Sequence, residues 1–211
     1  ESFHNFALDF SDMNNSGCKN RILSIFPVQS EVNLYESYTE FWAEIINALF
    51  CSFFSLKNKN NIEEFLSYSE FFINFERTYS FFQLVKTLRF MGLTYKDLYS
   101  KNINSKIMRE TLYKENTNVL SYYVIKTILL NNYQGFLFWC KKNNLSLLQF
   151  KKTLANQDEF CKFIEKNYKT SSMLESIDIS QKFLNNLYSK NKKLYDKYVL
   201  TNLRMSICEL G

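Results

Sequence analysis

Apolar side chains recur at intervals of three and four positions along most of this 211-residue chain, which is the pattern of amphipathic helices. The spacing of Phe3, Phe6 and Phe10 predicts a first helix over residues 1–13. After residue 61 the same spacing continues, and asparagine and glycine residues mark the expected helix ends. It predicts helices over residues 62–74, 76–91, 94–100, 105–115, 117–132, 134–142, 145–154, 156–168, 172–188 and 190–208.

The segment between the first helix and residue 61 has two parts. Residues 21–28 (RILSIFPV) are rich in β-branched side chains and include Pro27, which favours an extended segment or a short strand. Ser30 is a suitable N-cap for a long helix over residues 31–56. The run KNKNN at 57–61 then predicts a loop, and the asparagine that ends it caps the next helix.

The chain contains only four glycines and one proline, too few for the turns of an all-β sandwich or barrel. We therefore predict an all-α fold with at most one short strand, near residues 22–28. No linker interrupts the chain, so residues 1–211 are expected to form a single helical domain. Its first part, residues 1–56, holds the candidate chemistry, whereas residues 57–211 form a helical bundle to which the sequence assigns no role.

Charge and hydropathy exclude some kinds of partner. Lysine and arginine number 26 against 21 acidic residues, and this net charge of +5 is scattered over the predicted helix faces. Nucleic-acid binding needs a clustered basic stripe, so no nucleic-acid partner is expected. The apolar windows 41–56 and 119–140 are interrupted by charged and amide side chains, so no membrane span is expected either.

The five cysteines are odd in number, widely spaced and without a C-x-x-C pair. This favours free buried thiols in a reducing, intracellular compartment such as the cytoplasm. No signal peptide is visible, because Glu1 opens directly into a helical pattern, and the chain is expected to be part of a longer protein. The abundance of asparagine and lysine is typical of AT-rich codons.

Candidate chemistry begins with the single histidine, His4, which follows Glu1 by three positions. A histidine before Glu1 would complete H-E-x-x-H, in which two imidazoles one helical turn apart bind the same Zn²⁺. The glutamate of that motif activates the metal-bound water as a general base.

A second helix supplies carboxylates of the kind that complete such a site. Glu36, Glu40 and Glu44 are spaced four apart and fall within an arc of ~80° on one helix face. The following stretch, residues 41–54, is almost entirely apolar, which predicts a buried helix. Because buried carboxylates need partners, a metal ion is a suitable one.

The sequence ESFH at the start, followed by LYESYTEFWAE at 34–44, resembles the active-site helix and the glutamate helix of gluzincin-type zinc metallopeptidases. The resemblance covers residues 1–56. It departs from the family in the spacing of 32 positions between His4 and Glu36, which is longer than usual, so residues 14–30 must absorb the excess.

The resemblance implies a Zn²⁺ cofactor and a peptide or protein substrate. Glu1 would be the general base, and His4 would be a zinc ligand. Glu36 would be the third ligand, with Glu40 orienting a ligating histidine through its other ring nitrogen. The reverse assignment of Glu36 and Glu40 also fits the pattern, and both alternatives stay open.

A non-catalytic helical protein-interaction domain is the alternative. In that case the three glutamates form a solvated acidic face, and His4 has no chemical role. Zinc content separates the two hypotheses.

We expect histidine immediately before Glu1 in the parent gene, and stoichiometric zinc in a protein that includes it. Glu36→Gln should then abolish zinc binding, Glu40→Gln should weaken it by ~10–100-fold, and Glu1→Gln should keep the metal but lose turnover. Metal analysis and peptidase assays measure these effects. Any other residue before Glu1, or zinc content unchanged by both Glu36→Gln and Glu40→Gln, would exclude the peptidase.

Overall fold

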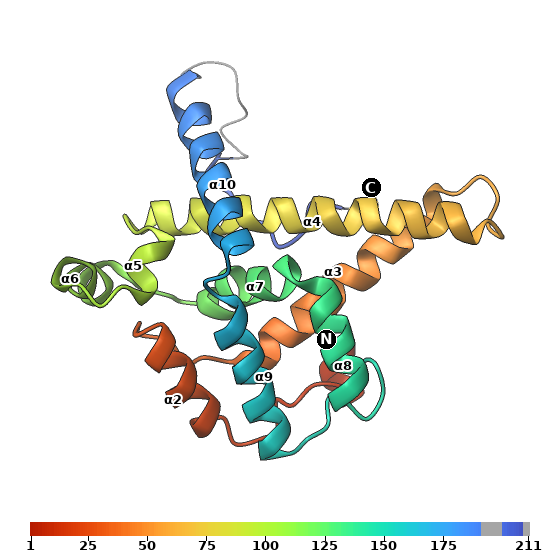
Figure 1. Ribbon diagram of the computed structural model, residues 1–211, viewed down its shortest axis with the longest axis horizontal. Coiled ribbons are helices and arrows are strands. Elements are labelled where there is room, and N and C mark those ends of the chain that lie inside the picture. Colours follow the sequence, from red (N-terminus) through yellow and green to blue (C-terminus); the bar gives the residue numbers. More distant parts are fainter. Residues whose placement is uncertain (191–199, 209–211) are drawn as a thin grey trace.

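The computed structural model describes residues 1–190 and 200–208, and these residues form α-helices, one π-helix and no strand, which confirms the all-α prediction (Figure 1). The elements are α1 (Ser2–Asn5), α2 (Ser16–Ile25), α3 (Leu34–Ser55), α4 (Ile62–Phe90), α5 (Tyr95–Tyr99), α6 (Ile103–Leu112), the π-helix η1 (Leu120–Ile125), α7 (Lys126–Asn131), α8 (Tyr133–Asn143), α9 (Leu154–Asn167) and α10 (Ser171–Lys190).

The long helices α3 and α4 form a hairpin whose arms diverge from the connecting loop; η1 and α7 contact both helices, and α10 packs on α4 (Figure 1). The loop at 57–61 lies where the sequence predicts it, and the Asn61 side chain accepts a hydrogen bond from the backbone N–H of Glu64 at 3.1 Å. The predicted break between residues 74 and 76 is wrong, because no glycine or proline interrupts the 29 residues of α4.

The closed end of this hairpin projects beyond the rest of the molecule, on the right of Figure 1. Helices α3 and α4 carry large apolar side chains there that are 41–71% exposed. The aromatic density of residues 66–90 predicts core packing, which is wrong for Phe71, Phe75 and Phe90, because nothing among the described residues covers their side of α4. The exposed side chains are Phe50, Phe53, Phe54, Ile62, Leu66, Phe71 and Phe75.

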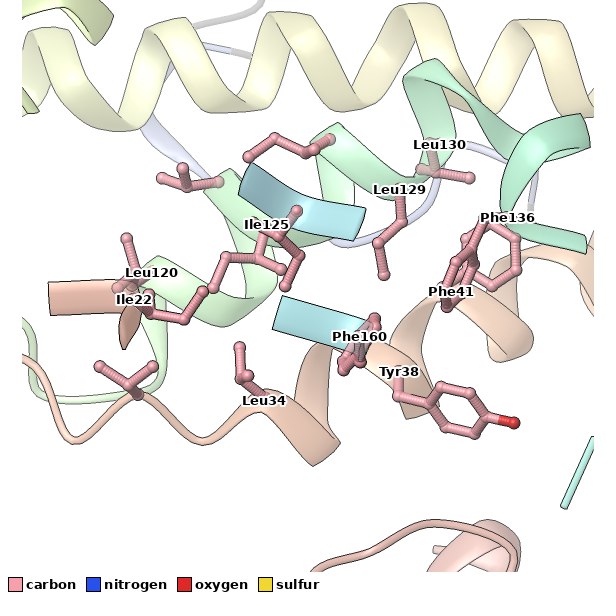
Figure 2. Close-up of a cluster of buried hydrophobic side chains, with 14 of the residues drawn as sticks. Ile22, Leu34, Tyr38, Phe41, Leu120, Ile125, Leu129, Leu130, Phe136 and Phe160 are labelled. Atoms are coloured by element: carbon pink, nitrogen blue, oxygen red, sulfur yellow. The ribbon is translucent and has the colours of Figure 1, made fainter. Parts of the chain in front are cut away.

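The main core lies below α4, where η1 and α7 are enclosed by α2, α3, α8 and α9 (Figure 2). Ile125, Leu129 and Phe136 are fully buried in it. Tyr38 is also fully buried, and its hydroxyl donates to the backbone carbonyl of Leu148 at 2.7 Å. This buried cluster extends from α1 to α10.

The start of the chain differs from the prediction in two places. The first helix ends at Asn5 instead of residue 13, because Ala7 takes a left-handed conformation with φ of 52°. The long helix begins at Leu34 instead of residue 31, because Val32 has φ of 53°, and Ser30 accepts the Val32 N–H instead of capping the helix.

The interpretation of residues 21–28 as an extended segment or short strand is wrong for residues 21–25, whereas the absence of a strand there agrees with the prediction of at most one. Residues up to Ile25 form α2, in which Cys18 and Ile22, one turn apart, both point into the core. On the outer side Arg21 pairs with Asp158 of α9 and also with Glu165, at 2.7 Å. Docking onto α9 therefore stabilises a helix that the local β-branched sequence does not favour.

Two other predicted helices differ from those in the structure. Residues 145–154 form a loop up to Thr153, in which the backbone N–H of Phe150 donates to the carbonyl of Leu8 at 2.8 Å. Of the helix predicted over 190–208, residues 191–199 lie outside the described part, and residues 202–208 are not helical.

All five cysteines are free and buried, as predicted. No helix in the described ranges is long and apolar enough to cross a membrane.

Two phenylalanines of α4 provide a test of this arrangement. Phe81 is 2% exposed and Phe71 is 61% exposed. Phe81→Ala should lower the free energy of unfolding by about 3–5 kcal/mol through the cavity it leaves. Phe71→Ala should lower it by less than about 1 kcal/mol. Urea unfolding of both variants checks this, and equal losses would mean that the first half of α4 is covered.

Candidate functional site

The residues predicted to bind zinc lie near the start of α3, where His4 and Glu36 interact with other side chains. The Nδ1 atom of His4 contacts the carboxylate of Asp9, which is 1% exposed, and its ring meets Tyr35 edge-on at 5.9 Å. Glu1 is exposed. Glu36 accepts a hydrogen bond from the side chain of Asn118 at 3.3 Å.

Among the predicted site residues, Glu40 interacts electrostatically with His4. Burial raises the pKa of Glu40, and Lys126, the amino terminus and His4 partly offset that effect. However, no three His, Cys, Asp or Glu side chains in the described residues are arranged to hold a metal ion. These residues alone do not fit a zinc centre, and the metallopeptidase, which requires a histidine before Glu1, stays a prediction.

The third glutamate of the acidic face, Glu44, has a different environment. It is 2% exposed, and its carboxylate forms an ion pair with the ammonium group of Lys126, which is 1% exposed. The sequence argument that a buried carboxylate on this helix needs a partner therefore holds for Glu44, but the partner is an ammonium group.

Lys126 owes its position to an unusual helix. It is the first residue of α7 and directly follows the π-helix η1. A π-helical turn is uncommon and occurs frequently at functional sites. The adjacent residue, Thr127, is fully buried, and its hydroxyl shares a hydrogen bond of 2.7 Å with Ser80 of α4. The junction of η1 and α7 thus presents polar side chains to both α3 and α4.

Glu76 of α4 is a second buried carboxylate, at 1% exposure. It accepts the backbone N–H of Cys208 at 2.8 Å and that of Ile207 at 3.2 Å. The hydroxyl of Ser206 also donates to it. All three donors belong to residues 200–208, which we call the C-terminal segment. Glu76 therefore binds main-chain and side-chain groups from a part of the chain about 130 residues away.

Three other buried or half-buried side chains also bind the main chain of the C-terminal segment. The Lys126 ammonium donates to the carbonyl of Met205 at 3.0 Å, in addition to pairing with Glu44. The Lys86 ammonium donates to the carbonyl of Asn202 at 2.6 Å. The amide of Asn47 donates to the carbonyl of Cys208. We call the side chains that surround this segment the polar cluster: Glu44, Asn47, Glu76, Lys86 and Lys126.

Burial dominates the electrostatics of the polar cluster. It raises the pKa of Glu44 to about 8, although Lys126 acts in the opposite direction. It lowers the pKa of Lys86 to about 8. Burial also raises the pKa of the Cys208 thiol to about 12, with Glu76 contributing. Burial therefore disfavours the charged forms of Glu44 and Lys86.

The sequence analysis did not identify the polar cluster, because it interpreted α4 from its aromatic residues. Those residues lie on other faces of the helix than the buried polar side chains. A stripe of buried polar side chains runs along the helix at intervals of seven, four, three and four positions. That spacing is a helical-face signal that the sequence alone contains. The stripe consists of Ser69, Glu76, Ser80, Gln83 and Thr87.

Two buried side chains of α3 and α4 contain polar atoms that have no hydrogen-bond partner among the described residues. Gln83 is 2% exposed, and neither atom of its side-chain amide has a hydrogen-bond partner among the described residues. The Oε2 atom of Glu44 is likewise buried and unpaired. Unpaired buried polar atoms are costly, so they mark this region as one with unused binding capacity.

Comparisons of the chain with protein-family models, with curated proteins and with solved structures find no match. The function of this chain is therefore inferred from the geometry of the polar cluster.

The raised pKa of Glu44 predicts a specific dependence of stability on pH. In the pH window above its ordinary pKa of 4.5, folded molecules retain the Glu44 proton to a greater extent than unfolded molecules do, because burial disfavours the carboxylate. The free energy of unfolding should therefore fall as pH rises through this window. Glu44→Gln should make that fall smaller, even though the groups facing Glu44, namely Lys126, Glu76 and Glu40, are unchanged.

Urea unfolding at several pH values measures this dependence. Glu70→Gln is the matched control, since Glu70 is an exposed glutamate of α4, and it should leave the pH dependence unchanged. The same pH dependence in wild type and Glu44→Gln would contradict the assignment.

Proposed function

We propose that this chain is a non-catalytic helical protein-interaction domain whose polar cluster binds an extended polypeptide segment through its main chain. The observation that carries this proposal is the seating of the C-terminal segment on buried charged side chains. Glu76 accepts two of its backbone N–H groups, and Lys126 and Lys86 donate to two of its carbonyls.

Main-chain recognition explains why the site consists of charged side chains. Every peptide presents N–H and C=O groups, and hydrogen bonds from these to charged groups contribute more than neutral ones do, about 1.5–3 kcal/mol each. The buried side chains come from three different helices, α3, α4 and α7, so a bound segment also holds these helices together. The site is therefore suited to bind a segment without reading most of its side chains.

The exposure of the bound residues indicates where selectivity lies. Leu203 and Ile207 are 45% and 37% exposed, so the site places little demand on them. Cys208 is 7% exposed and therefore requires a small side chain. We infer that the site accepts segments with a small residue at this position and varied residues at the two exposed positions.

The C-terminal segment is then an intramolecular occupant that a partner must displace. A segment of the same chain has a high effective concentration at its site, because its binding is intramolecular. A partner segment of ordinary affinity is therefore excluded until the C-terminal segment is released. The C-terminal segment and a partner segment therefore compete for the same site, and this competition regulates binding of the partner.

The projecting end of the α3–α4 hairpin supports an interaction role independently. Monomeric soluble proteins rarely expose large contiguous apolar patches. Phe50 and Phe54 stack on α3 at 6.4 Å between ring centroids, and Phe71 and Phe75 stack on α4 at 6.1 Å. These rings offer apolar contact area of the kind that interfaces use.

A labelled peptide that copies residues 200–208 tests the proposal by fluorescence anisotropy. Cys208→Arg in the full chain should displace its own segment, because an arginine does not fit the buried position. This variant should bind the wild-type peptide at least ~10-fold more tightly than the unaltered chain does, since the intramolecular competitor is gone. Ile207→Arg is the matched control and should leave peptide binding unchanged, because Ile207 is partly exposed.

Main-chain recognition is tested with the same variant. A peptide methylated on the backbone nitrogen of Cys208 cannot donate to Glu76 and should bind about 10-fold or more weakly. A peptide with Leu203→Ala should bind as the wild-type peptide does. No peptide binding by a folded Cys208→Arg chain, or equal binding of the methylated peptide, would contradict the proposed function.

A further inference from the structure

A second feature lies on the other side of the molecule, where α2 packs against α9. Cys18 of α2 and Cys161 of α9 are 4% and 1% exposed. Both cysteines line the same cavity between the two helices, although they lie far apart in sequence.

The register of the two helices is set by ion pairs beside the thiols. Arg21, one turn after Cys18, pairs with Asp158 and with Glu165, which flank Cys161 on the same face of α9. A disulfide requires Cβ atoms about 3.5–4.5 Å apart and little backbone movement. The ion pairs hold α2 and α9 in a fixed relation that keeps the thiols facing one another.

A cavity of about 570 Å³ reaches both thiols. Cys18, Cys161, Arg21 and Gln157 are among its lining residues. Gln157 is 3% exposed, and the Nε2 atom of its side chain has no hydrogen-bond partner among the described residues. This cavity therefore offers a small polar molecule both access to the sulfur atoms and an unused hydrogen-bond donor.

We propose that Cys18 and Cys161 are an oxidisable thiol pair, which a peroxide entering this cavity converts into a disulfide between α2 and α9. The inference is independent of the polar cluster. A reversible disulfide of this kind is compatible with a reducing compartment, where such bonds are transient and redox-sensing.

The two thiols differ in a way that assigns their roles. The neighbouring Cys161 lowers the pKa of Cys18, and the Arg21 guanidinium acts in the same direction. The neighbouring Cys18, together with burial, raises the pKa of Cys161. Because the thiolate is the nucleophile, Cys18 reacts first with the oxidant and Cys161 reacts second.

The chemistry proceeds in two balanced steps. The Cys18 thiolate attacks one oxygen of hydrogen peroxide, the O–O bond breaks, and the departing hydroxide takes up a proton to form water. Cys18 is now a sulfenic acid. The Cys161 sulfur then attacks the Cys18 sulfur and loses its proton, the S–O bond breaks, and the oxygen leaves as a second water. Two thiols are oxidised to one disulfide, and one peroxide is reduced to two waters.

The remaining cysteines provide internal controls. Cys140 is fully buried, and burial raises its pKa to about 12. It should therefore react more slowly than Cys18, since less thiolate is present at neutral pH. Cys140→Ser should accordingly leave oxidation of the thiol pair unchanged.

The test treats the full chain with hydrogen peroxide, blocks the remaining thiols by alkylation and identifies crosslinked peptides by mass spectrometry without reduction. We expect one dominant crosslink, between the peptides that contain Cys18 and Cys161, which dithiothreitol reverses. In Cys161→Ser the Cys18 sulfenic acid should accumulate and be trapped by dimedone. Cys140→Ser should form the crosslink at the wild-type rate.

Two outcomes would overturn the proposal. One is that Cys18 and Cys161 stay reduced in the wild-type chain under conditions that oxidise Cys140. The other is that dimedone labels Cys18 in Cys161→Ser no more than in wild type. The wild-type measurement does not depend on whether any variant folds.

Discussion

The structure depends on the burial of charge between α3, α4 and α7. Glu44 and Lys126 are almost fully enclosed, and removing such groups from water costs several kcal/mol per ion before any pairing. Their mutual attraction offsets this cost only when the remaining hydrogen-bonding capacity is also used. Lys126 meets that condition through the carbonyl of Met205, so the ion pair and the C-terminal segment stabilise each other.

This constraint explains the unusual character of α4. A helix at the surface of a small protein normally buries its apolar face and exposes its polar one. Helix α4 buries Glu76 of the polar cluster together with Ser80 and Gln83, while Phe71 and Phe75 face solvent on the projecting hairpin. One long helix thus joins two surfaces suited to binding, a polar site that uses main-chain hydrogen bonds and an apolar face that has no cover in the described residues.

The sequence determined the features that depend on neighbouring residues. The scarcity of glycine and proline and the three-to-four-residue spacing settled the helical class. The loop at 57–61 and its Asn61 cap follow from local chemistry, because the cap acts on a backbone group only three positions away. The five cysteines are free, as their odd number and wide spacing predict.

The sequence predictions were wrong where contacts between residues far apart in the chain override the local preference for helix or strand. Residues 21–25 are helical because α2 docks on α9 through Arg21, not because their β-branched side chains favour a helix. The acidic face of α3 and the burial of Glu44 were visible in the sequence, but its partner was not, because Lys126 lies 82 positions further along.

The C-terminal segment illustrates the same limit. Its apolar spacing predicts a helix, yet residues 202–208 are extended over buried carboxylate and ammonium groups. Only the fold brings α3, α4 and α7 together to provide those groups. Sequence pattern therefore determined the helical class and the position of the loop and cap that separate the two longest helices. Tertiary structure decided which of the ambiguous segments are helical and which side of each helix is buried, because both depend on what the neighbouring helices present.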